Sequence, residues 1–337
     1  MIFKREKSAD DILGRPAWQR IALVILGIIV VLNLVLGWYW SRSPEVFWVS
    51  EGPGGGDSYA VGYSTADTLV RVTERLLDKP GGYLSNDVMP PSVFLDNIPN
   101  WELGVLQQVR DLARVTRNDY SRSQSQSRED PGLAIAEPKI FFENNSWILP
   151  RTESEYRQAI DGFASYRDRL AQSGEDGAQF FARADNLREW LAQVEKRLGS
   201  LSRRLGDSVV SDVINTDLAG DPSADTSSSL PDRVPVQTSW FEIDDIFFEA
   251  RGTAWALVHF FRAAQFDFSG VLEDKNAEAS VRQIIRELEA SLQPLRSPII
   301  LNGGGYGLFA NHSLVMANYL ARANAAVINL RELLDQG

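Results

Sequence analysis

Hydrophobic and polar positions along the chain follow three patterns. Residues 21–40 form a continuous apolar run without a single charged side chain. Beyond residue 63, apolar side chains mostly recur every three or four positions, as on one face of an amphipathic helix. Residues 215–237 have no period and are rich in Ser, Asp and Pro. Because no segment alternates convincingly in the manner of a strand, we expect an all-α protein.

The apolar run 21–40 predicts a transmembrane helix. A helix of this length spans about 30 Å, which matches the hydrocarbon thickness of a bilayer. The run ends in Trp38, Tyr39 and Trp40, aromatic residues that suit the membrane–water interface. A cleaved signal peptide is the alternative, but its apolar core is shorter and is followed by small residues. We therefore expect one retained membrane helix that contacts lipids, rather than a signal peptide or a buried core helix.

Charge is unevenly distributed on the two sides of this run. Residues 1–44 carry a net charge of +3, and residues 45–337 carry −14. The positive-inside rule then places residues 1–20 in the cytoplasm as a short basic tail and sends the main domain across the membrane. The chain has 45 acidic and 34 basic residues, which argues against nucleic-acid binding.

The periodic segments predict antiparallel helices in a bundle. The cleanest pattern is at 187–205, where the apolar residues keep to one face and the opposite face is charged. A long helix is expected from about 100 to about 127. Another begins at Thr152, which would form a capping box with Glu155. The other predicted helices cover residues 64–78, 239–266, 276–293 and 306–334.

These elements suggest a division of the chain into a basic tail, a membrane helix and an extracytoplasmic domain. That domain begins with a Gly-rich stalk, continues as helices and is interrupted once by the aperiodic segment, which we interpret as a flexible linker. The pattern leaves open whether the helices form one lobe or two. The expected boundaries are tail 1–20, membrane helix 21–40, stalk 41–63, first lobe 64–214, linker 215–237 and second lobe 238–337.

Asn33 is the only strongly polar side chain of the predicted membrane helix, and Gly37 lies one turn further along the same face. One interpretation is a contact with a neighbouring helix, which leaves a homo-oligomer open. The other is a tolerated amide in a single span. Hydrogen bonds between membrane helices average only ~0.6 kcal/mol, so the pattern does not decide between the two.

We predict no catalytic residue, no cofactor and no metal site. The absence of Cys excludes thiol nucleophiles, disulfides and thiolate metal sites. His259 and His312 lie on apolar helical faces, which favours hydrogen-bonded core histidines over ligands or bases. Glu242, Asp245 and Glu249 share one helical face. Paired carboxylates can act as acid and base on a glycan, although a solvated acidic face is the simpler interpretation.

Five short runs resemble a bacterial family, the domain of unknown function 2333 family. The resemblance covers nearly the whole chain. It implies an inner-membrane protein of proteobacteria with one N-terminal span and a domain that faces the periplasm. It implies no catalytic residue and no cofactor. The runs are GGYLSND at 81–87, PNWE at 99–102, SRSQSQS at 121–127, NNSW at 144–147 and SEY at 154–156.

Three functions are consistent with these patterns. The leading hypothesis is a single-pass, non-catalytic protein of the bacterial inner membrane whose periplasmic bundle binds protein partners or scaffolds an envelope complex. The alternative is an envelope enzyme that acts on peptidoglycan or another glycan, with Glu242, Asp245 and Glu249 as first candidates. The third is a helical sensor for a small ligand. Its cytoplasmic tail is too short for an output domain, so a partner would have to carry the signal.

Overall fold

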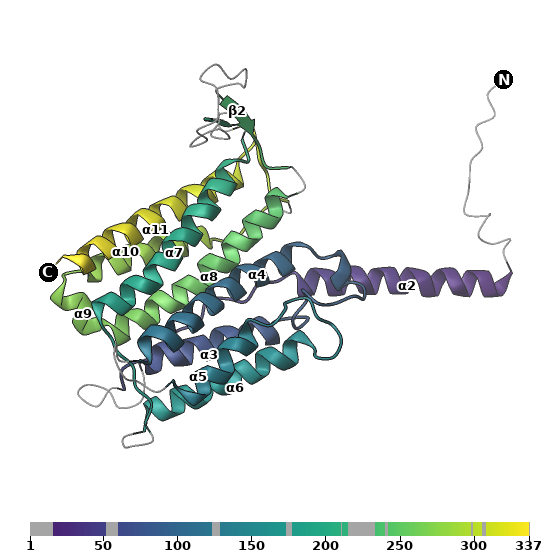
Figure 1. Ribbon diagram of the computed structural model, residues 1–337. Helices are drawn as coiled ribbons and strands as arrows, with labels where there is room; N and C mark the ends of the chain where they lie inside the picture. Colours follow the sequence, from purple (N-terminus) through teal and green to yellow (C-terminus); the bar gives the residue numbers. More distant parts are fainter. Residues whose placement is uncertain are drawn as a thin grey trace, which may run out of the picture.

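A computed structural model describes residues 16–51, 60–122, 129–172, 177–209, 211–214, 233–239, 242–297, 299–304 and 308–336. One long apolar helix, α2, projects from one end of a helical bundle (Figure 1). The prediction of an all-α bundle domain behind one N-terminal apolar helix is confirmed. The helices are α2 (Ala17–Trp40), α3 (Tyr63–Asp78), α4 (Asn97–Val115), α5 (Pro131–Ile140), α6 (Thr152–Leu170), α7 (Ala184–Gly206), α8 (Ile243–Asp267), α9 (Ser269–Asp274), α10 (Glu278–Ser291) and α11 (His312–Asp335).

Two short strands were missed by the sequence pattern, one directly before the predicted linker and one inside its C-terminal end. Strand β1 (Ser211–Ile214) pairs antiparallel with β2 (Arg233–Val236), with Ser211 opposite Val236. Four residues are too few for alternation to be recognised in a sequence. The intervening residues 215–232 lie outside the described residues. The predicted linker therefore has a strand at its C-terminal end.

The bundle is built around the pairing of α4 with α8. Helices α3, α5 and α6 pack together on one side of this pair, and α7, α10 and α11 pack together on the other (Figure 1). One hydrophobic core runs through both sides. Helix α7 precedes the predicted linker but packs along α11, which follows it. The helices of the two predicted lobes thus share a core, and the domain boundaries stay a prediction.

Hydrophobic periodicity identified the buried faces correctly. In α7 the apolar positions from Leu187 to Leu205 are all buried. The same holds for the stripe on α4 that starts at Trp101 and ends at Val115. Burial of these stripes is the main source of helix stability in a bundle, since isolated helices of this length are marginal in water.

The helix expected to reach residue 127 ends earlier. Helix α4 stops at Val115 and continues as one π-helical turn, Thr116–Tyr120. Its last carbonyl groups are used by a different segment: the Phe181 N–H donates to the Tyr120 carbonyl oxygen at 2.7 Å. Such tertiary bonds replace the partners that a continuing helix would supply. Residues 123–127 of the SRSQSQS run lie outside the described residues.

The predicted capping box at Thr152 is wrong, although the helix begins there. The Thr152 hydroxyl donates to the carbonyl oxygen of Glu143 at 2.9 Å, and its own oxygen accepts the N–H of Ser146 at 3.1 Å. Glu155 forms an ion pair with Lys139 at 2.6 Å. Both side chains therefore fix neighbouring segments rather than the helix end.

Candidate functional site

The C-terminal end of α2 is packed against the bundle. The ring of Trp40 lies on Gly81, which has a φ of +87°, and a side chain at Gly81 would clash with that ring. One turn earlier, Gly37 is buried, and a Cβ added there would lie 3.7 Å from both Pro91 and Leu95. A Cβ at that distance would be in ordinary van der Waals contact, so α2 meets a loop of the same chain here without requiring glycine.

The segment that follows α2 continues this attachment. Phe47 stacks on His259 with ring centroids 3.9 Å apart, and its N–H donates to His259 Nε2 at 3.0 Å. The Phe47 carbonyl oxygen accepts from Arg262 at 3.1 Å, and the Ser50 carbonyl oxygen accepts from the hydroxyl of Ser64 at 2.8 Å. The first part of the predicted stalk, through Glu51, thus lies on the bundle. Residues 52–59 are not among the described residues.

The prediction that His259 is a hydrogen-bonded core histidine is confirmed. Its side chain is fully buried, and Nδ1 donates to the Trp255 carbonyl oxygen at 2.6 Å while Nε2 accepts from Phe47. Both ring nitrogens are used only if the imidazole is neutral. Burial accordingly lowers the pKa of His259 to about 3.

A buried ion pair holds the loop that contacts α2. Glu102 of α4 accepts the N–H groups of Leu84 and Ser85, each at 2.8 Å, and pairs with Lys79, with both charged side chains fully buried. Burial lowers the pKa of Lys79 despite the neighbouring carboxylate. The pair fixes the backbone of residues 79–87, immediately before the loop that reaches α2.

The runs that carry the family resemblance meet at this place. Asn86 Nδ2 donates to the Ser146 carbonyl oxygen at 2.9 Å and to Glu153 at 2.8 Å, which ties loop 86–96 to loop 143–151. The rings of Tyr83 and Tyr156 are in edge-on contact at 5.7 Å. Four of the five runs, at 81–87, 99–102, 144–147 and 154–156, therefore build one structure beside the end of α2. We call this structure the junction.

The two loops of the junction expose large apolar side chains. Phe94 is 76% exposed and Leu149 is 91% exposed. Soluble surfaces rarely gather so many apolar side chains, and such gatherings mark interaction surfaces. The prolines at 90, 91 and 99 predict only a loop from the sequence. The density of apolar residues between those prolines is the signal that could have revealed the surface. The exposed members are Val88, Met89, Val93, Phe94, Trp147, Ile148 and Leu149.

A groove of about 620 Å³ separates loop 86–96 from the side of α2. It is lined by one face of α2 between residues 29 and 41 and by Pro90, Pro91, Phe94 and Leu95. Asn33 lies in this face. Its amide donates to the Ile29 carbonyl oxygen at 2.9 Å, while its own side-chain oxygen has no partner among the described residues. The lining extends from Ile29 to Ser41, twelve residues further along, so the groove follows α2 for about 18 Å.

Two of the three candidate carboxylates, Asp245 and Glu249, are directed to different helices. Asp245 accepts from Asn100 of α4 at 2.6 Å, and burial raises the pKa of Asp245. Glu249 is buried and pairs with Arg204 of α7 at 2.9 Å, so the interpretation as a solvated face is wrong for this residue. Glu242 is the N-cap residue of α8 and makes no side-chain capping bond. Within the described residues, no group of three His, Asp or Glu side chains is placed to hold a metal ion.

His312 is not a core residue. It is half-buried and lines a second pocket, and its Nδ1 accepts the Leu301 N–H at 3.0 Å. Phe247 of α8 lines the same pocket and precedes His259 by twelve residues, about 18 Å along the helix. His259 and His312 therefore belong to separate parts of the bundle.

Comparison with known proteins places the chain in a family. The family model DUF2333, described as an uncharacterized protein conserved in bacteria, matches residues 14–337. The chain belongs to this family. Neither the curated proteins nor the solved structures gave a match. The DUF2333 match begins before α2, so the apolar helix and the bundle are both part of what the family shares.

Proposed function

We propose that the protein is a single-pass membrane protein whose bundle is seated against the outer face of the bacterial inner membrane and acts there as a non-catalytic binding or scaffold component. The junction carries this proposal. It joins a helix long and apolar enough to cross a bilayer to two loops with exposed apolar side chains.

The packing of α2 supports a retained anchor over a cleaved signal peptide. Cleavage after the apolar run would remove Trp40 from Gly81 and Gly37 from Leu95. It would also uncover the apolar loop residues that now flank the groove. Almost the whole of α2 is exposed, which is unfavourable in water and expected in lipid.

The position of the loops supports contact with the lipid. Phe94 lines the same groove as Ile29 and Val30, which lie well inside the apolar run. If Trp38 lies at the outer interface, the tip of loop 86–96 reaches hydrocarbon depth. A lipid acyl chain is then the natural occupant of the groove, because its walls are apolar apart from Asn33 and Ser41.

The charge distribution supports an orientation with the N-terminus in the cytoplasm. The net charge is +3 for residues 1–44 and −14 for residues 45–337. The bundle would then lie in the periplasm. An enzyme with paired carboxylates receives less support, because Asp245 and Glu249 are engaged with Asn100 and Arg204.

The seating can be tested with single cysteines, since the natural chain has none. A fluorescent label on Leu149→Cys is expected to be quenched by brominated lipids in nanodiscs. The same label on Glu273→Cys, in α9 at the end opposite α2 (Figure 1), is expected to be unaffected. Equal quenching at both positions, or none at Leu149→Cys, would contradict the proposed seating.

Orientation and the scaffold role need separate measurements. A reporter enzyme fused to the C-terminus should be active only in the periplasm. Extraction in mild detergent should recover the protein with a partner or as an oligomer. Migration as a lone monomer under several gentle conditions would remove the scaffold role while leaving the membrane anchor in place.

A further inference from the structure

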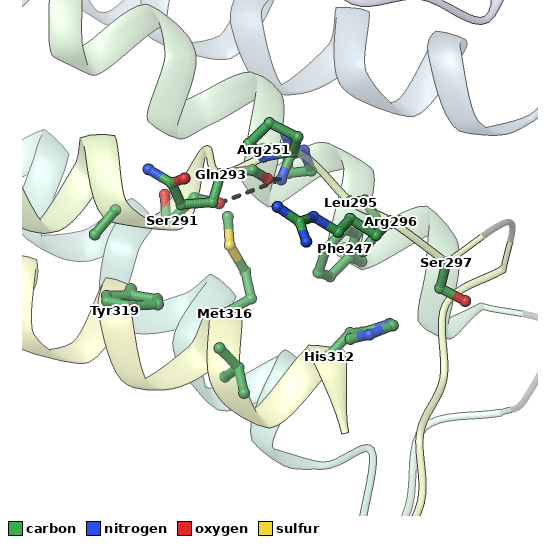
Figure 2. A pocket seen from close by; sticks show the side chains of 13 residues that line it. Phe247, Arg251, Ser291, Gln293, Leu295, Arg296, Ser297, His312, Met316 and Tyr319 are labelled. Atoms are coloured by element: carbon green, nitrogen blue, oxygen red, sulfur yellow. Dashed lines mark hydrogen bonds between the residues drawn. The ribbon is translucent and has the colours of Figure 1, made fainter. Parts of the chain in front are cut away.

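A second pocket lies where α8, α10 and α11 meet. Its residues are distant in sequence from those of the junction. It has a volume of about 320 Å³ and is bounded by the first part of α8, the C-terminal end of α10 with the residues after it, and the start of α11 (Figure 2). This volume is at the lower end of the range for small-molecule sites.

The pocket is cationic in a chain with a net charge of −11. Arg251 and Arg296 are among the 13 residues that line it, and none of the 13 is acidic. Figure 2 shows the side chain of Arg296 pointing into the pocket on the side where Arg251 lies. The lining therefore brings two guanidinium groups together without a carboxylate among its described residues, which favours an anion as ligand.

Arg251 is fixed in place by neutral acceptors. Its guanidinium donates to the carbonyl oxygens of Leu292 and Gln293, both at 3.1 Å, at the C-terminal end of α10. That helix end balances part of the charge through its dipole. Burial lowers the pKa of Arg251, and within the described residues the side chain has no ion-pair partner. These hydrogen bonds fix the orientation of the guanidinium group but do not neutralise its positive charge.

The remaining walls supply one further donor and an apolar surface. Because His312 Nδ1 accepts the Leu301 N–H, the neutral ring carries its proton on Nε2, which is therefore a donor. Phe247 and Met316 provide an apolar face, and Tyr319 lies beside them (Figure 2). The pocket thus combines donors with a surface that suits a flat apolar group.

We propose that this pocket binds a small organic anion. Its carboxylate or phosphate group is held by Arg251 and Arg296, and its apolar body lies against Phe247 and Met316. The planar fork of arginine matches the oxygens of both anionic groups. This proposed ligand site does not depend on the proposed contact between the junction and the membrane.

Calorimetric titration of the full-length protein in detergent tests the proposal. The probes are phenyl phosphate and benzoate. Inorganic phosphate is the comparator without an apolar body, and phenol is the comparator without an anionic group. We expect at least one probe to bind more tightly than both comparators. Arg296→Gln should weaken that binding at least tenfold. The matched variant Arg282→Gln removes an exposed arginine of α10 outside the pocket and should leave the Kd within twofold.

Failure of both probes to saturate the protein at millimolar concentration would overturn the proposal, as would equal affinity in Arg296→Gln and the natural chain. Arg296 is exposed, so the thermal midpoint of the variant should be unchanged and a loss of binding is not a loss of folding. Repeating the titration in nanodiscs with and without phosphatidylglycerol distinguishes the source of the anion. Competition by that lipid indicates a headgroup, and unchanged affinity indicates a soluble ligand.

Discussion

In the buried pair of Lys79 and Glu102, one carboxylate fixes the backbone of a loop. The carboxylate accepts two main-chain N–H groups of the loop and neutralises a lysine that has no access to solvent. Neither residue stood out in the sequence, because a lysine before a proline and a glutamate in a helix are ordinary. Only the fold brings them together, since 23 residues separate them.

Glu102→Gln is expected to destabilise the protein by about 3–5 kcal/mol, because it leaves the Lys79 charge buried and unpaired. Chemical denaturation in detergent measures the change in the free energy of unfolding. Lys79→Met combined with Glu102→Gln should recover part of the loss, since the charge is then removed. Glu278→Gln breaks an exposed pair and should cost no more than about 1 kcal/mol. If the double variant is as unstable as Glu102→Gln, the buried charge is not the cause.

His259 makes the stability depend on pH in a defined direction. Its pKa in the folded state is about 3, below the ordinary value of 6.5. The unfolded chain therefore binds a proton first, and folding stability is lost as the pH falls below 6.5, at up to about 1.4 kcal/mol for each pH unit. Above pH 6.5 this residue adds no pH dependence.

His259→Gln should flatten the dependence between pH 6.5 and 5, because the amide can keep both hydrogen bonds without titrating. The measurement is the free energy of unfolding at several pH values for both proteins. The difference between their slopes isolates the histidine from other groups that titrate in the same range. Parallel curves would show that the folded protein binds a proton at His259 as readily as the unfolded chain does.

At the scale of elements, periodicity predicted which faces are buried and some helix ends, such as that of α3 at Asp78, but not the end of α4 or how closely helices cross. The apolar stripes on α4 and α7 are buried as expected. Helix ends depend on partners from other segments, such as the Phe181 N–H on the Tyr120 carbonyl oxygen, and such partners are not visible in a local pattern. Helix α5 escaped prediction for a related reason, since a ten-residue helix with an internal proline has a weak period.

The crossing of α4 and α8 depends on two glycines, Gly104 and Gly252. A methyl group on Gly252 would overlap the carbonyl oxygen of Trp101, and one on Gly104 would overlap that of Glu249. Gly252→Ala should therefore destabilise the protein by about 1–3 kcal/mol through displacement of the backbone. The control is Gly270→Ala in α9, where the added Cβ meets nothing within 4 Å. That change should be neutral or stabilising by up to about 1 kcal/mol. Equal thermal midpoints for the two variants would refute the tight crossing.

At the scale of the whole molecule, sequence alone predicted a long apolar helix and a bundle but treated them as separate parts joined by a stalk. The structure shows them in contact through Trp40 and through Phe47, which lies on His259. This contact could not be predicted from the sequence, because a contact between distant segments has no periodic signature. The same argument applies to the exposed loops, whose apolar residues become a surface only when Asn86 ties one loop to the other.

If these loops enter the membrane, they should bind lipid without the anchor. A chain that begins at residue 42 should sediment with lipid vesicles, because each buried Phe or Leu side chain contributes about 1.5–3 kcal/mol. Phe94→Ser with Leu149→Ser should reduce the bound fraction severalfold. The matched pair, Phe309→Ser with Leu308→Ser, removes equally exposed side chains from the segment before α11 and should bind as the parent does. Circular dichroism and thermal midpoints establish that each chain is folded. Equal losses in both pairs would mean that the association is a general effect of apolar surface, and full binding by the first pair would place the loops outside the lipid.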